Sequence, residues 1–341
     1  MRKSPTRALT KRVLTISMSS SPRSAKRKRR DSSNDEEHQP EEIRRSSDYW
    51  FNDGNVILQV ETTQFQVAKS LLAMHSTVFR DMLTLPLPSE EPLVEGCPVV
   101  VLAGDSAEDW THLMAAMFPT SYFRAGPIEL PVLAALLRLT KKYDIPGIRQ
   151  PLVERLKQEF PTTLEAFSPI KDWTLLPAGD SPNETVVGLI NLAREIGLYT
   201  ILPTLFYSLD FSDVQDKAFQ LLSEADQVTC FRGYATMLKQ NDLKSTAWLK
   251  REPGKAVAKD CEDIRACRAA LKSLAYTHFL SVEGRELILE PWDERWGKGL
   301  CERCLTISRK VFDIARDIRW AAMPGVFGLP EWEELEKMDF E

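Results

Sequence analysis

The sequence predicts an α+β domain, a small sheet capped by a helical cluster, followed by a mainly α-helical C-terminal region. Short stretches that alternate apolar and polar residues, as half-buried strands do, occupy residues 56–67. Stretches with apolar residues at helical spacing follow, interrupted by the apolar run 99–102. Strands therefore come first and helices after, unlike the alternating strand–helix order of a nucleotide-binding sheet.

Composition divides the chain into four parts. Residues 1–47 form a polar tail, and 48–165 form the α+β domain. Residues 166–182 read as a linker that contains Pro, Asp and Gly, and 183–341 read as a mainly helical domain. The length of 341 residues exceeds the usual size of a single core, which agrees with two folded units plus a tail.

The tail is expected to be disordered and basic. It is poor in aromatic residues and rich in Ser, Arg and Lys, so it cannot bury enough apolar surface to offset its ordering entropy. It holds 13 Lys/Arg and 6 Asp/Glu, a net charge of +7, whereas the whole chain carries −5, which leaves −12 on the remainder. An acidic folded part argues against a broad nucleic-acid-binding face there.

One basic cluster lies within the tail and is a candidate nuclear-import signal. It consists of Lys26, Arg27, Lys28, Arg29 and Arg30. An acidic import receptor, or a phosphate backbone, can hold such a block in extended form. The alternative is a solvated charge run without a function. Met18 is a plausible second start, so the sequence leaves open whether translation begins at Met1 or Met18.

The α+β domain is expected to start with a hairpin of two strands, within 56–60 and 65–67. A helix should follow at 69–75, and Ser76 is a good N-cap for the next one. The stretch 86–98 reads as a loop. Ser106 is the expected N-cap of a helix with a continuous apolar stripe, and two more helices should follow it.

The wording of this domain resembles the BTB/POZ domain, and the resemblance covers about a third of the chain. The matching segments are Asp53–Val60, Phe65–Val67, His75–Met82, Glu95–Val100, Ser106–Asp109 and Leu136–Tyr143. They are similar to those of single-BTB proteins found in mushroom-forming fungi (Basidiomycota). Two later segments, Ala193–Leu198 and Phe327–Pro330, also look like that group.

The resemblance implies a protein-interaction adaptor or scaffold. BTB domains commonly act in homodimeric nuclear scaffolds or as substrate adaptors of cullin ubiquitin ligases, and the sequence does not choose between these. Many dimeric BTB domains carry an extra helix before the first strand, where this chain has only Tyr49–Phe51. A weak homodimer is therefore expected. The alternative function is a nuclear, transcription-associated regulator that uses the basic tail.

The C-terminal region is expected to be helical. Asn183 can cap a helix that Gly197 closes, and Ser212 can cap another. Longer helical runs are expected at 256–280 and 301–320.

Metal binding is the sharpest chemical candidate in this region. Cys301 and Cys304 form a CxxC pair that could share one helix face, with Cys261 and Cys267 upstream. On one helix, positions six apart lie about 240° apart around the axis, so the upstream thiols are expected to diverge. Buried free thiols are then the favoured interpretation, no metal site is predicted, and Cys301 and Cys304 remain candidates only.

No catalytic residues, cofactor or enzymatic activity are predicted. The sequence contains no P-loop, GxGxxG or HExxH, and its four histidines do not suggest a catalytic set. No apolar run approaches the roughly 20 residues of a membrane helix. Six sparse cysteines do not resemble a secreted disulfide framework. The expectation is an intracellular protein of the nucleus, the cytoplasm or both, with other proteins as partners.

Overall fold

The computed structural model describes residues 42–85, 93–118, 126–167, 173–177, 182–211, 217–240, 257–275, 289 and 291–340. The basic cluster Lys26–Arg30, most of the tail, and both candidate start residues lie outside these ranges. So do Ser212, His38 and His278. Residues 42–341 form one compact unit.

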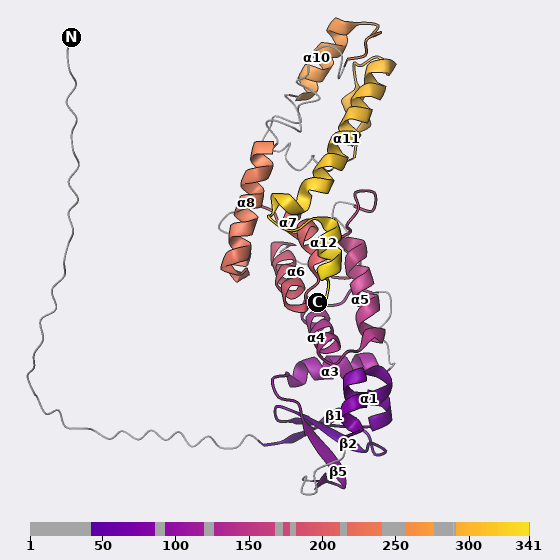
Figure 1. Cartoon of the computed structure of the whole chain (residues 1–341), viewed down its shortest axis with the longest axis vertical. Coiled ribbons are helices and arrows are strands. Elements are labelled where there is room, and N and C mark those ends of the chain that lie inside the picture. Colours follow the sequence, from indigo (N-terminus) through magenta and orange to yellow (C-terminus); the bar gives the residue numbers. More distant parts are fainter. Residues whose placement is uncertain are drawn as a thin grey trace, which may run out of the picture. The chain divides into compact units, whose positions relative to one another are not determined.

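A five-stranded sheet begins the fold, with the strand order β1-β3-β2-β5-β4. Figure 1 labels β1, β2 and β5 of this sheet. The strands are β1 (Arg44–Trp50), β2 (Val56–Val60), β3 (Thr63–Val67), β4 (Leu93–Val94) and β5 (Cys97–Val101). β2 and β3 form the predicted antiparallel hairpin, and β5 confirms the strand predicted near 99–102. β1 pairs with β3, and β5 with β2, in parallel.

Two strands correct the sequence-based expectation. β1 begins at Arg44, inside the tail that was predicted to extend to residue 47. β4 lies in the stretch 86–98, which was predicted as a loop, and it pairs with β5 through a turn in which Glu95 and Gly96 have positive φ. Both strands lie at the edges of the sheet, and pairing with a neighbour rather than an apolar pattern makes them strands. Neither could be recognised by periodicity.

Five helices complete this domain and confirm the predicted order of elements. They are α1 (Lys69–His75), α2 (Thr77–Leu83), α3 (Ala107–Met117), α4 (Leu130–Lys142) and α5 (Pro146–Glu159). Ser106 caps α3, as predicted, by accepting hydrogen bonds from the backbone N–H groups of Glu108 and Asp109. The apolar stripe of α3 is buried, from Trp110 to Met117.

Ser76 both caps α2 and ties it to the end of α4. Its Oγ accepts a hydrogen bond from the backbone N–H of Phe79 at 3.0 Å and donates one to the backbone carbonyl of Tyr143. We expect Ser76→Ala to lower the free energy of unfolding by about 2 kcal/mol, because it removes a cap and a buried hydrogen bond. Ser106→Ala is the matched control, since it removes only a cap and should cost about 1 kcal/mol. Urea denaturation of both variants would test this ranking, and equal costs would contradict it.

The rest of the described chain is mainly helical, as predicted, although the helical run expected at 256–280 begins only at Ile264. It contains α6 (Pro182–Ile196), η1 (Tyr199–Ile201), α7 (Leu202–Tyr207), η2 (Lys217–Leu221), α8 (Glu224–Gln240), α10 (Ile264–Leu274), η6 (Glu294–Gly297), α11 (Glu302–Val326) and α12 (Trp332–Met338). Gly197 follows α6 with φ +73°, which confirms its predicted role in ending that helix. None of the described helices is long and apolar enough to cross a lipid bilayer.

The stretch predicted as a linker and the predicted cap Asn183 both differ from expectation. Leu175 and Leu176 lie within residues 166–182, yet their side chains are buried in the main core. Asn183 follows the first residue of α6 instead of preceding the helix, and its side chain exchanges two hydrogen bonds with the backbone of Asp210. It therefore fastens α6 to the end of α7, and the described part of the linker belongs to the fold.

The described residues form two separate hydrophobic cores. The larger one runs from the sheet through α3, α4 and α5 into α6 and α7. The smaller one contains nine buried residues: Val257, Ala258, Cys267, Leu271, Leu274, Trp292, Trp296, Cys304 and Phe312. It lies between α10 and the first half of α11 (Figure 1).

Candidate interaction domain and candidate metal centre

The α+β domain is held together around the buried carboxylate of Asp105. Its Oδ2 accepts hydrogen bonds from Trp110 Nε1 at 2.9 Å and from the Tyr143 hydroxyl, and its Oδ1 lies 2.5 Å from Lys142 Nζ. Burial, together with the hydrogen bond to Asp105, raises the pKa of Tyr143 well above its ordinary value. The rings of Trp110, Tyr143 and Phe79 contact one another, with centroids 4.8–5.9 Å apart. This network fixes α2, α3 and α4 relative to the sheet.

The outer surface of the α1–α2 pair carries exposed apolar side chains. Met74, near the end of α1, is 70% exposed, and Val78, in the first turn of α2, is 41% exposed. The other side of each helix faces the core, since Leu72 of α1 and Phe79 of α2 are buried. Exposed apolar side chains can contribute to a contact with another protein when they lie together on a surface. We call Met74 and Val78 the α1–α2 surface.

The opposite end of the domain is covered by the chain's own C-terminal region. Arg138 of α4 forms a bidentate pair with Glu195 of α6 at 2.8 Å. Lys141 Nζ donates to the carbonyl of Ile196 at 2.8 Å, and Lys157 Nζ lies 2.6 Å from Asp339 Oδ2. α4 and α5 are therefore occupied, whereas the α1–α2 surface is not buried by other described residues.

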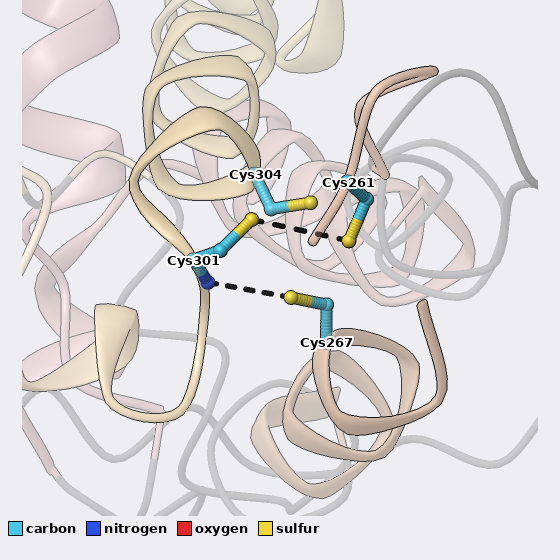
Figure 2. A group of neighbouring side chains, drawn as sticks. All are labelled: Cys261, Cys267, Cys301 and Cys304. Atoms are coloured by element: carbon cyan, nitrogen blue, oxygen red, sulfur yellow. Dashed lines mark hydrogen bonds between the residues drawn. The ribbon is translucent and has the colours of Figure 1, made fainter. Parts of the chain in front are cut away.

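A second site lies in the smaller core, where four cysteines meet. Cys261, Cys267, Cys301 and Cys304, here named the four-cysteine cluster, place all four Sγ atoms within 4.8 Å of one another. Figure 2 shows the four side chains pointing toward a common centre. The Sγ atoms of Cys261 and Cys301 are 3.9 Å apart, and all the cysteines are free thiols. Cys267 and Cys304 are buried, while the other two are half-buried.

The beginnings of two helices bring these thiols together. Cys301 is the N-cap of α11 and Cys304 lies in its first turn. Cys267 lies in the first half of α10, and Cys261 lies in the turn before that helix. The expectation that Cys261 and Cys267 diverge on one helix is wrong, because the side chain of Asp263 caps α10 and the helix starts only at Ile264. An Asp before a helical stretch is a recognisable start signal, so this placement could have been found in the sequence.

Backbone N–H groups surround the cluster. The N–H of Cys301 donates to Cys267 Sγ, and the N–H of Ala258 donates to Cys304 Sγ, both at 3.3 Å. Backbone hydrogen bonds from Glu262 and from Cys304 lower the pKa of Cys301 to about 6. Burial acts in the opposite direction on two other thiols of the cluster, since it raises the pKa of Cys261 and of Cys304. It also raises the pKa of Cys230, outside the cluster, to about 12. The cluster thus contains at least one thiol whose surroundings favour the thiolate.

The aromatic residues of this core pack tightly against one another. Trp292, Trp296 and Phe312 form three edge-to-face contacts with centroids 5.4–5.6 Å apart. Trp320 and Trp332 stack on each other elsewhere, and Trp320 Nε1 donates to the carbonyl of Thr162. These four late tryptophans, Trp292, Trp296, Trp320 and Trp332, therefore contribute to packing.

Comparison with known families identifies the α+β domain. Residues 50–159, from the last residue of β1 through α5, match the family model of the BTB/POZ domain. The match covers strands β2 to β5, the Asp105 network and the α1–α2 surface, and it ends before the four-cysteine cluster. A comparison with curated proteins gives no match.

Proposed function

Because residues 50–159 form a BTB/POZ domain, which is a protein-interaction module, we propose that this chain is an adaptor that joins two proteins. One partner binds the BTB domain and the other binds the helical C-terminal region. The observation that supports this division is the coverage of α4 and α5 by the chain's own helices. The partner of the BTB domain would then bind elsewhere on the domain, and we propose the α1–α2 surface for it.

Self-association of the BTB domain through the edge strand β1 is proposed to be weak. β1 is an edge strand, and edge strands offer unpaired backbone groups to a second chain. Here, however, the edge carries two exposed arginines, Arg44 and Arg45, and its pairing with β3 is irregular between Arg45 and Trp50. Charges and irregular pairing both discourage edge-to-edge association. Light scattering of the full-length protein should show mostly monomer at low concentration, whereas a tight dimer would contradict the proposal.

A cullin is the partner class that we propose for the BTB domain. BTB domains in general bind cullins or associate with a second BTB domain. The exposed arginines on β1 make self-association the weaker of the two interactions here. The C-terminal region would then hold the protein to be ubiquitinated, as a substrate adaptor does.

The experiment that tests the adaptor function compares captured partners from cells. We expect Met74→Asp combined with Val78→Asp to lose the partner of the BTB domain, because two charges disrupt an apolar contact. Leu221→Asp is the matched control, since Leu221 is 64% exposed on η2 in the C-terminal region. Leu221→Asp should retain that partner.

Direct binding of a purified cullin to the wild type but not to the Met74→Asp/Val78→Asp variant would support the cullin assignment. Identical partner sets for all three proteins would contradict the adaptor function at this surface.

A nuclear regulator is the second candidate function, and the basic cluster Lys26–Arg30 supports it. Deleting those five residues separates two roles. Loss of nuclear accumulation with unchanged nucleic-acid affinity would support an import signal. Loss of nucleic-acid affinity, with a lower salt dependence, would instead support direct contact with a phosphate backbone.

A further inference from the structure

We propose that the four-cysteine cluster binds one Zn²⁺ ion in a structural, four-thiolate site. The site is separate from the BTB domain, and it does not depend on the adaptor function.

The positions of the sulfur atoms fit a single tetrahedral ion. With zinc–sulfur bonds of about 2.3 Å, the edges of a tetrahedron of four sulfurs are about 3.8 Å long. The Sγ atoms of Cys261 and Cys301 are already 3.9 Å apart, and no pair in the cluster is separated by more than 4.8 Å. Small side-chain movements would bring every sulfur into bonding distance of a central ion. A disulfide would need sulfurs about 2.05 Å apart, much closer than those of Cys261 and Cys301.

The donor set favours zinc over other metals. Four thiolates in tetrahedral positions are typical of zinc or of iron–sulfur sites. A two-iron cluster distributes its cysteines over two iron atoms, which requires the sulfurs to spread further than a single ion does. Four protein ligands also fill the coordination shell, so no position remains for water or substrate, and the role is structural.

The surroundings of the sulfurs resemble the second layer of contacts around a bound metal. Backbone N–H groups of Cys301 and Ala258 donate hydrogen bonds to sulfurs of the cluster, which stabilises negative charge on them. Arg303 fastens the turn that carries Cys261 to α11, since its Nη1 contacts the carbonyl of Asp260 at 2.9 Å and that residue's carboxylate at 2.8 Å. On binding the ion, each thiol that is still protonated releases its proton to solvent.

The size of the smaller core supplies an independent reason for a metal. Among the described residues, nine buried ones form this core, and they are separate from the main core. Small folded modules commonly add a metal or disulfides to a limited core. The ion would join the turn before α10, α10 itself and the start of α11, which are the segments that enclose Trp292 and Trp296.

Metal analysis of the full-length protein tests the site. The protein is produced in zinc-supplemented medium and purified with reductant and without chelator, and its zinc and iron contents are measured by mass spectrometry. We expect one zinc per chain. Cys261→Ser combined with Cys301→Ser should lose nearly all the zinc, because it removes one ligand from each helix start. Cys97→Ser combined with Cys230→Ser is the matched control and should retain it, since both residues lie outside the cluster. Iron in place of zinc, or zinc retained by the first variant, would overturn the proposal.

Two further measurements on the wild type do not depend on whether a variant folds. Titration of the thiols with an organomercurial should release the zinc, detected with an indicator dye, and replacement by Co²⁺ should give the strong visible and sulfur charge-transfer bands of a tetrahedral thiolate site. Metal removal should also change the near-ultraviolet circular dichroism from Trp292 and Trp296. A wild type without stoichiometric zinc, a cobalt spectrum without sulfur bands, or an unchanged tryptophan signal would each contradict a structural zinc site.

Discussion

Asp105→Ala is expected to lower the free energy of unfolding by about 3–5 kcal/mol, the largest effect of any single substitution considered for the BTB domain. The side chain of Asp105 is 4% exposed and serves three donors. Without it, Trp110 Nε1–H and the Tyr143 hydroxyl stay buried and lose their acceptor. Lys142 is 46% exposed and can return to water, so its contribution to the loss is small.

Two variants make this prediction specific. Asp105→Asn keeps one acceptor oxygen and should cost about half as much, whereas Asp53→Ala removes an exposed carboxylate and should change stability by less than about 0.5 kcal/mol. Urea denaturation gives the magnitudes, and hydrogen exchange of α3 and α4 shows where the loss occurs. An Asp105→Ala protein within about 1 kcal/mol of the wild type would mean that the network is not buried as described.

Asp339→Ala is the second large prediction, with an expected loss of about 2–4 kcal/mol. The Asp339 carboxylate accepts from Thr200 N at 3.0 Å and from Thr200 Oγ1 at 2.8 Å, and it also pairs with Lys157 of α5. Thr200 is fully buried, so both of its donors would lose their partner with no access to water. Lys157 is 39% exposed and contributes less.

The effect of Asp339→Ala should be confined to one region. We expect faster hydrogen exchange in α12 and η1, while the sheet of the BTB domain keeps its protection. Glu334→Ala is the matched control, because Glu334 belongs to α12 but forms only an exposed pair with Lys337, which is worth less than about 1 kcal/mol. Uniform loss of protection across the sheet and α12 would show instead that the two parts unfold as one.

Local patterns predicted most of the BTB domain. The hairpin follows from alternation in residues 56–67, and Ser76 and Ser106 mark two helix starts by their ability to cap. These signals depend only on nearby residues. β1 and β4 depend instead on a partner strand that the sequence does not indicate, so they were missed.

The four-cysteine cluster shows a different kind of error. The CxxC pair is recognisable in the sequence. The helical run expected at 256–280, however, places Cys261 and Cys267 on one helix. The start of that helix at Ile264 moves Cys261 into a turn, and this single boundary decides whether the thiols diverge or converge. Helix boundaries are the least certain product of sequence patterns, so an argument about side-chain direction should first look for a cap such as Asp263.

The hydrogen bond between Lys157 and Asp339 joins residues 182 positions apart, which has a consequence during synthesis of the chain. At a translation rate of about 5–20 residues per second, α5 emerges from the ribosome roughly 10–40 s before Asp339 exists. The BTB domain can collapse within that interval, but the sides of α4 and α5 that the later helices cover remain open to water. The nascent chain therefore presents apolar surface for many seconds, and we expect chaperones to bind it at this stage and to leave when α12 docks.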